Sequence, residues 1–233
     1  MEIVVGPAGN LGLRLAFTET PAPALTYGLL SIQAKAQQEF ADVLVDSVVG
    51  YTTLTLFFQP LALDRERTQH WLEEHAMRLK LTADGPDEGC KTITLPVLYH
   101  PSVAPDLEWL AEHQNLSVDD VIERHSGNPY FAYATGFAPG FCYLGTVDER
   151  LSTPRLSTPR VNVAAGSVAI ADQQTAVYPC ASPGGWRLIG ACPTTLFDLE
   201  SKPAALLSVG DSVKFEPITL NDFQTLKANQ DNL

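Results

Sequence analysis

The sequence predicts an α+β protein with a mixed N-terminal part and an all-β C-terminal part. Residues 1–99 alternate β-branched runs with helical apolar stripes. Residues 100–128 contain two short amphipathic helices, and from Pro129 onward the apolar period changes to two. The chain has 233 residues, of which 45% are hydrophobic, so it is long enough to bury one large core or two smaller ones.

The N-terminal elements follow the order strand, helix, strand, strand, helix, strand. After a first short strand at Ile3–Val5, the elements are Leu13–Phe17, helix Tyr27–Phe40, Val43–Val49, Thr53–Phe58, a helix that Asp64 can cap and that reaches Lys80, and strand Lys91–Leu98. This order is typical of a small two-layer unit that resembles a ferredoxin-like fold, which we expect over residues 1–99. Residues 82–89 are expected to form a polar loop within it.

The helical segment at 100–128 is expected to connect two domains. Asp106–His113 has the pattern of a short amphipathic helix, and Ser117 begins a second one. Asp120, three residues later, can act as the partner of Ser117 in a capping box, and Gly127 is a suitable residue to end this helix.

The C-terminal part is expected to form a compact barrel or sandwich over residues 129–218. Helical patterns are absent here, and the tail at 219–233 is polar and expected to fray. The short strands, separated by Pro and Gly turns, are Ser167–Ala171, Thr175–Tyr178, Trp186–Ile189, Thr195–Leu199 and Ser212–Glu216.

Charge and composition exclude several classes of protein. The net charge of −12 argues against binding to nucleic acid or to an anionic membrane surface, because both need clustered Lys and Arg. No apolar run approaches the roughly 20 residues that span a bilayer, and no secretory leader is visible. The four cysteines are far apart and show no metal-ligand spacing, so we expect a cytoplasmic protein without a metal site.

Proline, glycine and aromatic residues are concentrated between residues 136 and 190. The window contains Gly136-Phe-Ala-Pro-Gly-Phe-Cys-Tyr-Leu-Gly145, a repeated Leu-Ser-Thr-Pro-Arg at 151–160, and Ser182-Pro-Gly-Gly-Trp-Arg-Leu-Ile-Gly190. This composition indicates shaped loops that present side chains at a binding site. The candidate substrate-binding residues are Phe137, Pro139, Gly140, Phe141, Tyr143, Ser182, Gly184, Gly185 and Trp186. The alternative is that the aromatic rings only fill the end of a barrel.

Arginine supplies all the positive charge between Gly127 and Ser201. Its planar guanidinium binds carboxylate or phosphate in a bidentate manner and cannot shuttle protons. Arg155 and Arg160 are five residues apart, so on a plain strand they would point to opposite faces. We therefore expect one to reach the binding site and the other to form a structural pair. Together with Tyr178 they are the candidate catalytic residues, and the alternative for the arginines is a set of surface salt bridges.

A complete hydrolytic site is not visible in this window. The 127–201 segment contains no His, and the chain has no phosphate-binding loop, no nucleophile elbow and no zinc motif. Cys142 has no cationic neighbour in the sequence and is expected to be a small buried apolar residue. His125 is expected at a helix C-terminus, where the helix dipole favours its charged form. We infer an active site that another polypeptide completes.

The motifs resemble the allophanate hydrolase subunit 1 family over about residues 95–217. They occur in family order, together with Ala165-Gly-Ser-Val168, Tyr178-Pro179 and Val209-Gly-Asp211. The resemblance implies a small α/β N-terminal domain followed by a cyclophilin-like β-barrel. It also implies a hydrolase that acts on a cyclic amide as the B subunit of an ATP-dependent 5-oxoprolinase, which converts 5-oxo-L-proline to L-glutamate together with C-like and A-like subunits of the same complex.

Two other functions are compatible with this resemblance. The family includes an inhibitor of a sporulation histidine kinase, so the chain is alternatively a protein-binding regulator. A third reading is a carboxyltransferase-type subunit of a carboxylase that acts on urea or a related amide. ATP is the cofactor that the first reading implies, and the sequence does not locate its site.

Overall fold

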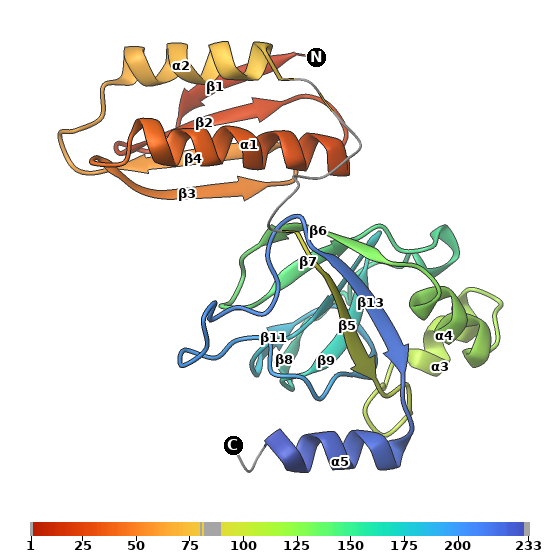
Figure 1. Ribbon diagram of the computed structural model, residues 1–233. Helices are drawn as coiled ribbons and strands as arrows, with labels where there is room; N and C mark the ends of the chain where they lie inside the picture. Colours follow the sequence, from red (N-terminus) through yellow and green to blue (C-terminus); the bar gives the residue numbers. More distant parts are fainter. Residues whose placement is uncertain (1, 80, 82–89, 231–233) are drawn as a thin grey trace. The chain divides into compact units, whose positions relative to one another are not determined.

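The computed structural model describes residues 2–79, 81 and 90–230, which form two compact units, Met1–Cys90 and Lys91–Leu233. The predicted loop at 82–89 lies outside the described residues. Both helices and strands are present, with a nearly closed barrel-like sheet in the second unit, and the predicted mixed fold class is confirmed (Figure 1). None of the helices in the described residues has both the length and the apolar content needed to cross a membrane.

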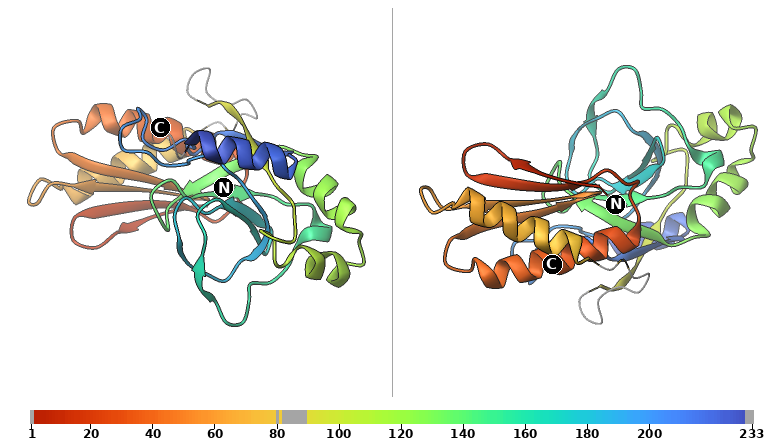
Figure 2. Two further views of the ribbon diagram at one scale, coloured as in Figure 1. Left: turned by 90° about the horizontal axis from the view of Figure 1, so that it is seen from below. Right: turned by 90° about the horizontal axis from the view of Figure 1, so that it is seen from above.

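The first unit is a four-stranded antiparallel sheet with two helices on one face (Figures 1 and 2). Alternating residues of β2 and β4, such as Leu15 and Leu56, are fully buried, as expected for a sheet with one covered face. The elements are β1 (Ile3–Pro7), β2 (Gly12–Phe17), α1 (Pro23–Glu39), β3 (Leu44–Gly50), β4 (Thr53–Phe58) and α2 (Arg65–Met77). The Asp64 side chain accepts a hydrogen bond from the Arg67 amide at 3.0 Å, so the predicted N-cap of α2 is present.

One strand lies in a different unit from the one that the sequence suggested. β5 (Thr92–Val97) was expected to complete the first unit, but it pairs in parallel with β13 (Ser212–Pro217) of the second unit. Its inward side chains, Leu95 and Val97, are fully buried in the core of that unit. The edge position that β5 would have taken beside β2 is occupied by β1, so the neighbours β2, β4 and β3 keep their ferredoxin-like order.

The second unit is built on a seven-stranded sheet in the order β12-β9-β10-β7-β6-β13-β5. Leu98, just after β5, and Ala191, at the end of β12, exchange two backbone hydrogen bonds of 2.8 and 3.0 Å, which bring the two edges of the sheet together. The remaining elements are α3 (Leu107–His113), α4 (Val118–Ser126), β6 (Tyr130–Thr135), β7 (Cys142–Gly145), the 3₁₀ turn η1 (Glu149–Leu151), β8 (Arg160–Val163), β9 (Ser167–Ala171), β10 (Gln174–Val177), β11 (Ser182–Gly184), β12 (Arg187–Ala191) and α5 (Leu220–Gln230).

Strand β9 is buried on both faces, and this divides the core of the second unit in two. Val168 and Ile170 point into the barrel interior, where they join the large apolar cluster. Ala169 and Ala171 point the other way, into a second cluster that contains aromatic rings. Because alanine is small, the outer face of β9 leaves room for large rings to pack on it.

The helices of the second unit confirm one prediction and correct another. Ser117 and Asp120 form the predicted reciprocal capping box, with backbone-to-side-chain distances of 3.0 and 2.9 Å. Residues 219–233 were expected to fray, but Leu220–Gln230 forms α5. Thr219 and Asp222 make a second capping box at its start, with distances of 3.3 and 3.2 Å. Most α5 side chains are exposed, so the segment has no apolar stripe to predict it.

His125 is neutral and fully buried, and the expectation that the helix dipole keeps it charged is wrong. Burial alone lowers its pKa from 6.5 to about 3. Thr175 Oγ1 donates to the Ala169 carbonyl, so it must accept from His125 Nε2 at 2.8 Å. Nδ1 of the same ring then accepts from the Tyr99 hydroxyl at 2.7 Å, and Phe215 stacks on the ring. Both ring nitrogens therefore have partners only in the neutral form.

This burial predicts a loss of stability in acid. Between about pH 3 and 6.5 the unfolded chain binds a proton at His125 that the folded chain does not bind. The free energy of unfolding should therefore fall as the pH is lowered through this range, by up to about 1.4 kcal/mol per pH unit from this group. Urea denaturation across the range measures the slope. His125→Gln should reduce it, whereas the exposed His70→Gln should leave it unchanged; equal slopes in all three proteins would contradict the assignment.

Candidate functional site

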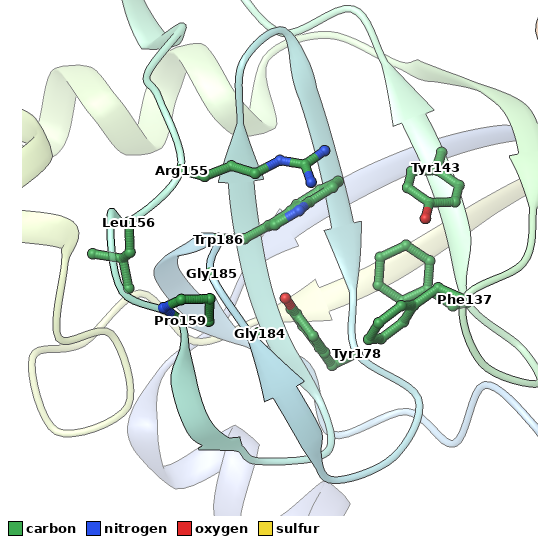
Figure 3. Close-up of a pocket in the computed structure, with 10 residues that line it drawn as sticks. Phe137, Tyr143, Arg155, Leu156, Pro159, Tyr178, Gly184, Gly185 and Trp186 are labelled. Carbon is green, nitrogen blue, oxygen red and sulfur yellow. The ribbon is translucent and has the colours of Figure 1, made fainter.

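A pocket of about 180 Å³ opens on the outer face of the barrel, over the alanine side of β9 (Figure 3). It is lined by Phe137, Phe141, Tyr143, Arg155, Leu156, Pro159, Tyr178, Gly184, Gly185 and Trp186. The residues come from the loop before β7, from β7 itself, from the repeated pentapeptide, and from the segment that runs from the end of β10 through β11 to β12. Segments up to about fifty residues apart thus meet around one cavity.

Most of the candidate residues from the sequence gather in this pocket, and four do not. Pro139 and Gly140 form the turn between the two pocket phenylalanines, and Ser182 lies at the start of β11. Arg160 points instead toward Asp106. Leu156 and Pro159, which line the pocket, were missed. They belong to the second copy of the pentapeptide, and the Leu156 amide donates to the Gly185 carbonyl at 2.7 Å.

The pocket walls are a packed set of aromatic rings. Phe141, 2% exposed, lies in the middle, with its ring centre 4.9 Å from that of Tyr143, 5.5 Å from that of Tyr178 and 5.9 Å from that of Trp186. The contacts to Tyr143, Tyr178 and Trp186 are edge-to-face, the geometry that aromatic pairs prefer. These rings hold one another in place, so the apolar surface that a ligand would meet is formed before binding.

Phe137 lies at the open side of the pocket and is 61% exposed. Its φ of +70° is in the left-handed region, which is unfavourable for a bulky residue. The preceding Gly136 and the following Gly140 also have positive φ, and their flexibility allows the loop to turn this sharply. The ring is held edge-on by Phe141 at 5.2 Å and Tyr178 at 6.2 Å, so Phe137 covers part of the pocket.

Arg155 brings the positive charge to the pocket. Its Cζ atom lies 5.8 Å from the centre of the Trp186 ring, and Figure 3 shows the guanidinium beside that ring. Its ion pair with Asp172 is loose, with 3.8 Å between Nε and Oδ2, and the Arg155 side chain is 58% exposed. The guanidinium is therefore accessible to an anion that enters the pocket, while the preceding proline restricts the backbone that carries it.

Tyr178 can donate a hydrogen bond in the pocket. Its pKa is raised, chiefly by burial, so its hydroxyl keeps its proton at neutral pH. The backbone amide of Trp186 is a hydrogen-bond partner of this hydroxyl, and in Figure 3 the hydroxyl points toward Gly184 and Trp186. A proton-accepting role for Tyr178 at neutral pH is therefore unfavourable, and a donor role is favourable.

The described lining residues include no His, Cys, Asp, Glu or Lys. Cys142 follows Phe141 but points to the barrel interior, where burial raises the pKa of its thiol to about 12, which confirms it as an inert apolar residue. Within the described residues, no group of three or more His, Cys, Asp or Glu side chains is placed to hold a metal ion. The pocket can bind and orient a small anion with an apolar body, but it lacks a group that moves protons at neutral pH.

Two adjacent glycines provide a matched test of the pocket geometry. A Cβ atom at Gly184 would collide with the Tyr178 hydroxyl and lie 2.9 Å from its Cζ, whereas one at Gly185 would meet its neighbours at an ordinary 3.7 Å. Gly184→Ala should therefore lower the free energy of unfolding by about 1–3 kcal/mol through overpacking. Gly185→Ala should change it little. Chemical denaturation measures both, and equal effects would show that Tyr178 does not occupy this position.

A family model and known proteins match this chain over most of its length. The model of the "Carboxyltransferase domain, subdomain C and D" matches residues 3–207. The B subunit of 5-oxoprolinase from Bacillus subtilis is 37% identical, and the match covers 78% of this chain and 79% of that protein. The B subunit of 5-oxoprolinase from Escherichia coli O157:H7 is 42% identical, with 74% and 78% covered.

A solved structure has the same architecture. The crystal structure of TTHA0988 superposes with a TM-score of 0.76 at 32% identity and covers 89% of this chain. The chain spans only 40% of the length of that protein. The family that the motifs predicted is confirmed by the three curated relatives that share it. The chain belongs to the family of the carboxyltransferase domain, subdomain C and D, which its sequence shares with 5-oxoprolinase B subunits.

Proposed function

We propose that this chain is the B subunit of an ATP-dependent 5-oxoprolinase and helps convert 5-oxo-L-proline to L-glutamate with hydrolysis of ATP. The identity to proteins named as the B subunit of 5-oxoprolinase, over three quarters of the chain, supports the assignment. In this proposal the active enzyme is a cytoplasmic complex with A-like and C-like partner subunits, and the chain on its own is inactive.

The observation that carries the proposal is the placement of Arg155 beside Trp186 in an otherwise apolar pocket. 5-Oxoproline is a five-membered ring that carries one carboxylate at neutral pH. The Arg155 guanidinium matches that carboxylate, and the aromatic rings match the body of the lactam. The Tyr178 hydroxyl and the amides of Gly184 and Gly185 are the candidate donors to the lactam oxygen, where negative charge develops when the amide is attacked.

The partners supply what the pocket lacks. The lactam is a resonance-stabilised amide, and phosphorylation of its oxygen by ATP creates a better leaving group. The described pocket residues include one cation and no acid–base group that titrates near neutrality, so a partner protein must contribute the remaining groups. We assign the ATP site to the partners, because the sequence of this chain contains no phosphate-binding loop.

Reconstitution tests the proposed function. The chain is purified with its C-like and A-like partners, and ADP and glutamate are measured with and without 5-oxoproline. We expect both products in equal amounts only when substrate and all three proteins are present. A complete mixture without 5-oxoproline-dependent ADP release would overturn the proposal. Inhibition of histidine-kinase autophosphorylation, or carboxylation of urea with bicarbonate by the mixture, would then identify one of the two alternative functions.

Arg155 should determine the affinity of the complex for substrate. Arg155→Gln removes a charge-assisted hydrogen bond worth about 1.5–3 kcal/mol, so KM for 5-oxoproline should rise roughly 10- to 100-fold. Arg150→Gln is the matched control, because Arg150 is also exposed and lies five residues earlier outside the pocket lining. Steady-state kinetics of the reconstituted complex compare the two. A KM that is unchanged by Arg155→Gln would remove this residue from the binding site.

A further inference from the structure

A buried carboxylate outside the pocket holds the backbone that follows Trp186. Asp106, 6% exposed, lies between the loop after β5 and α3. Its side chain accepts a hydrogen bond from the Leu188 amide at 2.7 Å, and its own amide donates to the Leu188 carbonyl at 3.0 Å. Both backbone polar groups of Leu188 are therefore bound by one residue that lies 82 positions earlier in the chain.

Arg160 extends this network to Trp186 itself. The Nη2 atom of Arg160 is 2.8 Å from each of the two carboxylate oxygens of Asp106. Its Nη1 atom donates to the Trp186 carbonyl at 3.2 Å. Contact with both oxygens fixes the orientation of a planar guanidinium as well as its distance, so this donor remains aimed at Trp186. The Trp186 amide is bound to the Tyr178 hydroxyl, so both backbone polar groups of Trp186 are also engaged.

Arg187 occupies the other side of the carboxylate. Its Nη1 atom is 3.8 Å from Asp106 Oδ1, and its Cζ atom is 3.5 Å from the centre of the Trp109 ring on α3. Two arginines therefore flank Asp106, one from β8 and one from β12. Each of the three consecutive residues 186–188 is thus tied to Asp106, either directly or through the arginine that Asp106 holds.

We propose that Asp106 is a positioning residue for the pocket: through Arg160 and Leu188 it sets the place of the Trp186 ring, on which Arg155 and Phe141 lie. Asp106 does not touch the cavity and takes no part in the chemistry. The functional side of this inference rests on the proposed binding of substrate in the pocket. Its structural side, the place of the Trp186 ring, does not depend on that function.

Fluorine NMR tests the structural side directly. The full chain has three tryptophans and is labelled with 5-fluorotryptophan, and Trp71→Phe, Trp109→Phe and Trp186→Phe assign the three resonances. Asp106→Asn should shift or broaden the Trp186 resonance in the folded protein. Arg160→Gln, which removes the bond to the Trp186 carbonyl but keeps Asp106 on Leu188, provides the same test if Asp106→Asn does not fold. A wild-type Trp186 resonance in a folded variant of either kind would overturn the proposal.

Asp148→Asn is the matched control. Asp148 forms an ion pair with Arg124 at 2.9 Å in the same unit, and both side chains are partly buried, but neither lines the pocket. Asp148→Asn should lower the melting temperature without moving the Trp186 resonance. The double variant Asp106→Asn with Arg160→Gln separates position from stability. It removes both charges, so its melting temperature should rise above that of Asp106→Asn, while the Trp186 resonance stays perturbed.

Kinetics of the reconstituted complex test the functional side. Arg160→Gln, and Asp106→Asn where it folds, should raise KM for 5-oxoproline by about tenfold and change kcat less, because a displaced wall weakens binding of substrate and transition state alike. Asp148→Asn should leave both constants unchanged. A moved Trp186 resonance with an unchanged KM would refute the functional role. If the wild-type complex has no turnover, the proposed function fails, and the NMR result alone still decides where Asp106 places Trp186.

Discussion

The buried pair of Asp106 and Arg160 is the interaction on which the second unit depends most. It joins the start of α3 to β8, and through the Leu188 backbone it joins both to β12. Removal of one partner from such a pair typically costs about 3–5 kcal/mol, because the other charge remains buried. An apolar contact would serve stability as well, but it would not fix direction. The carboxylate, with its three aligned donors, does fix direction, and the pocket lies on the strand segment that it holds.

Shape in the pocket comes from the alternation of large and small residues on the outer face of the barrel. Alanines at 169 and 171 accept the rings of Phe141, Tyr178 and Trp186, while Val168 and Ile170 on the same strand fill the interior. Gly184 lies so close to Tyr178 that a side chain there has no room. The cavity is thus bounded by residues that are either rigid rings or have no side chain to move, which lowers the entropic cost of binding a small ligand.

The sequence predicted what is local and missed what depends on distant partners. The pocket residues were identified because most lie in one window of Pro, Gly and aromatic residues, and two capped helices were identified from their first turns. The pairing of Arg160 with Asp106 spans 54 residues and leaves no local pattern, so only the odd spacing of Arg155 and Arg160 suggested that one of them is structural. The same limit explains β5, whose alternation predicts a strand but not its neighbour, and His125, whose burial is set by Phe215 far along the chain.

The parallel pairing of β5 with β13 has a consequence for biosynthesis. Residue 92 lies beside residue 212, so the seven-stranded sheet lacks a member until nearly the whole chain has left the ribosome. The first unit, whose strands pair within residues 3–58, has no such dependence and can acquire its sheet early. During that interval the apolar side chains of β5 have no partner strand, and the ribosome holds the nascent chain in a state that is open to chaperones.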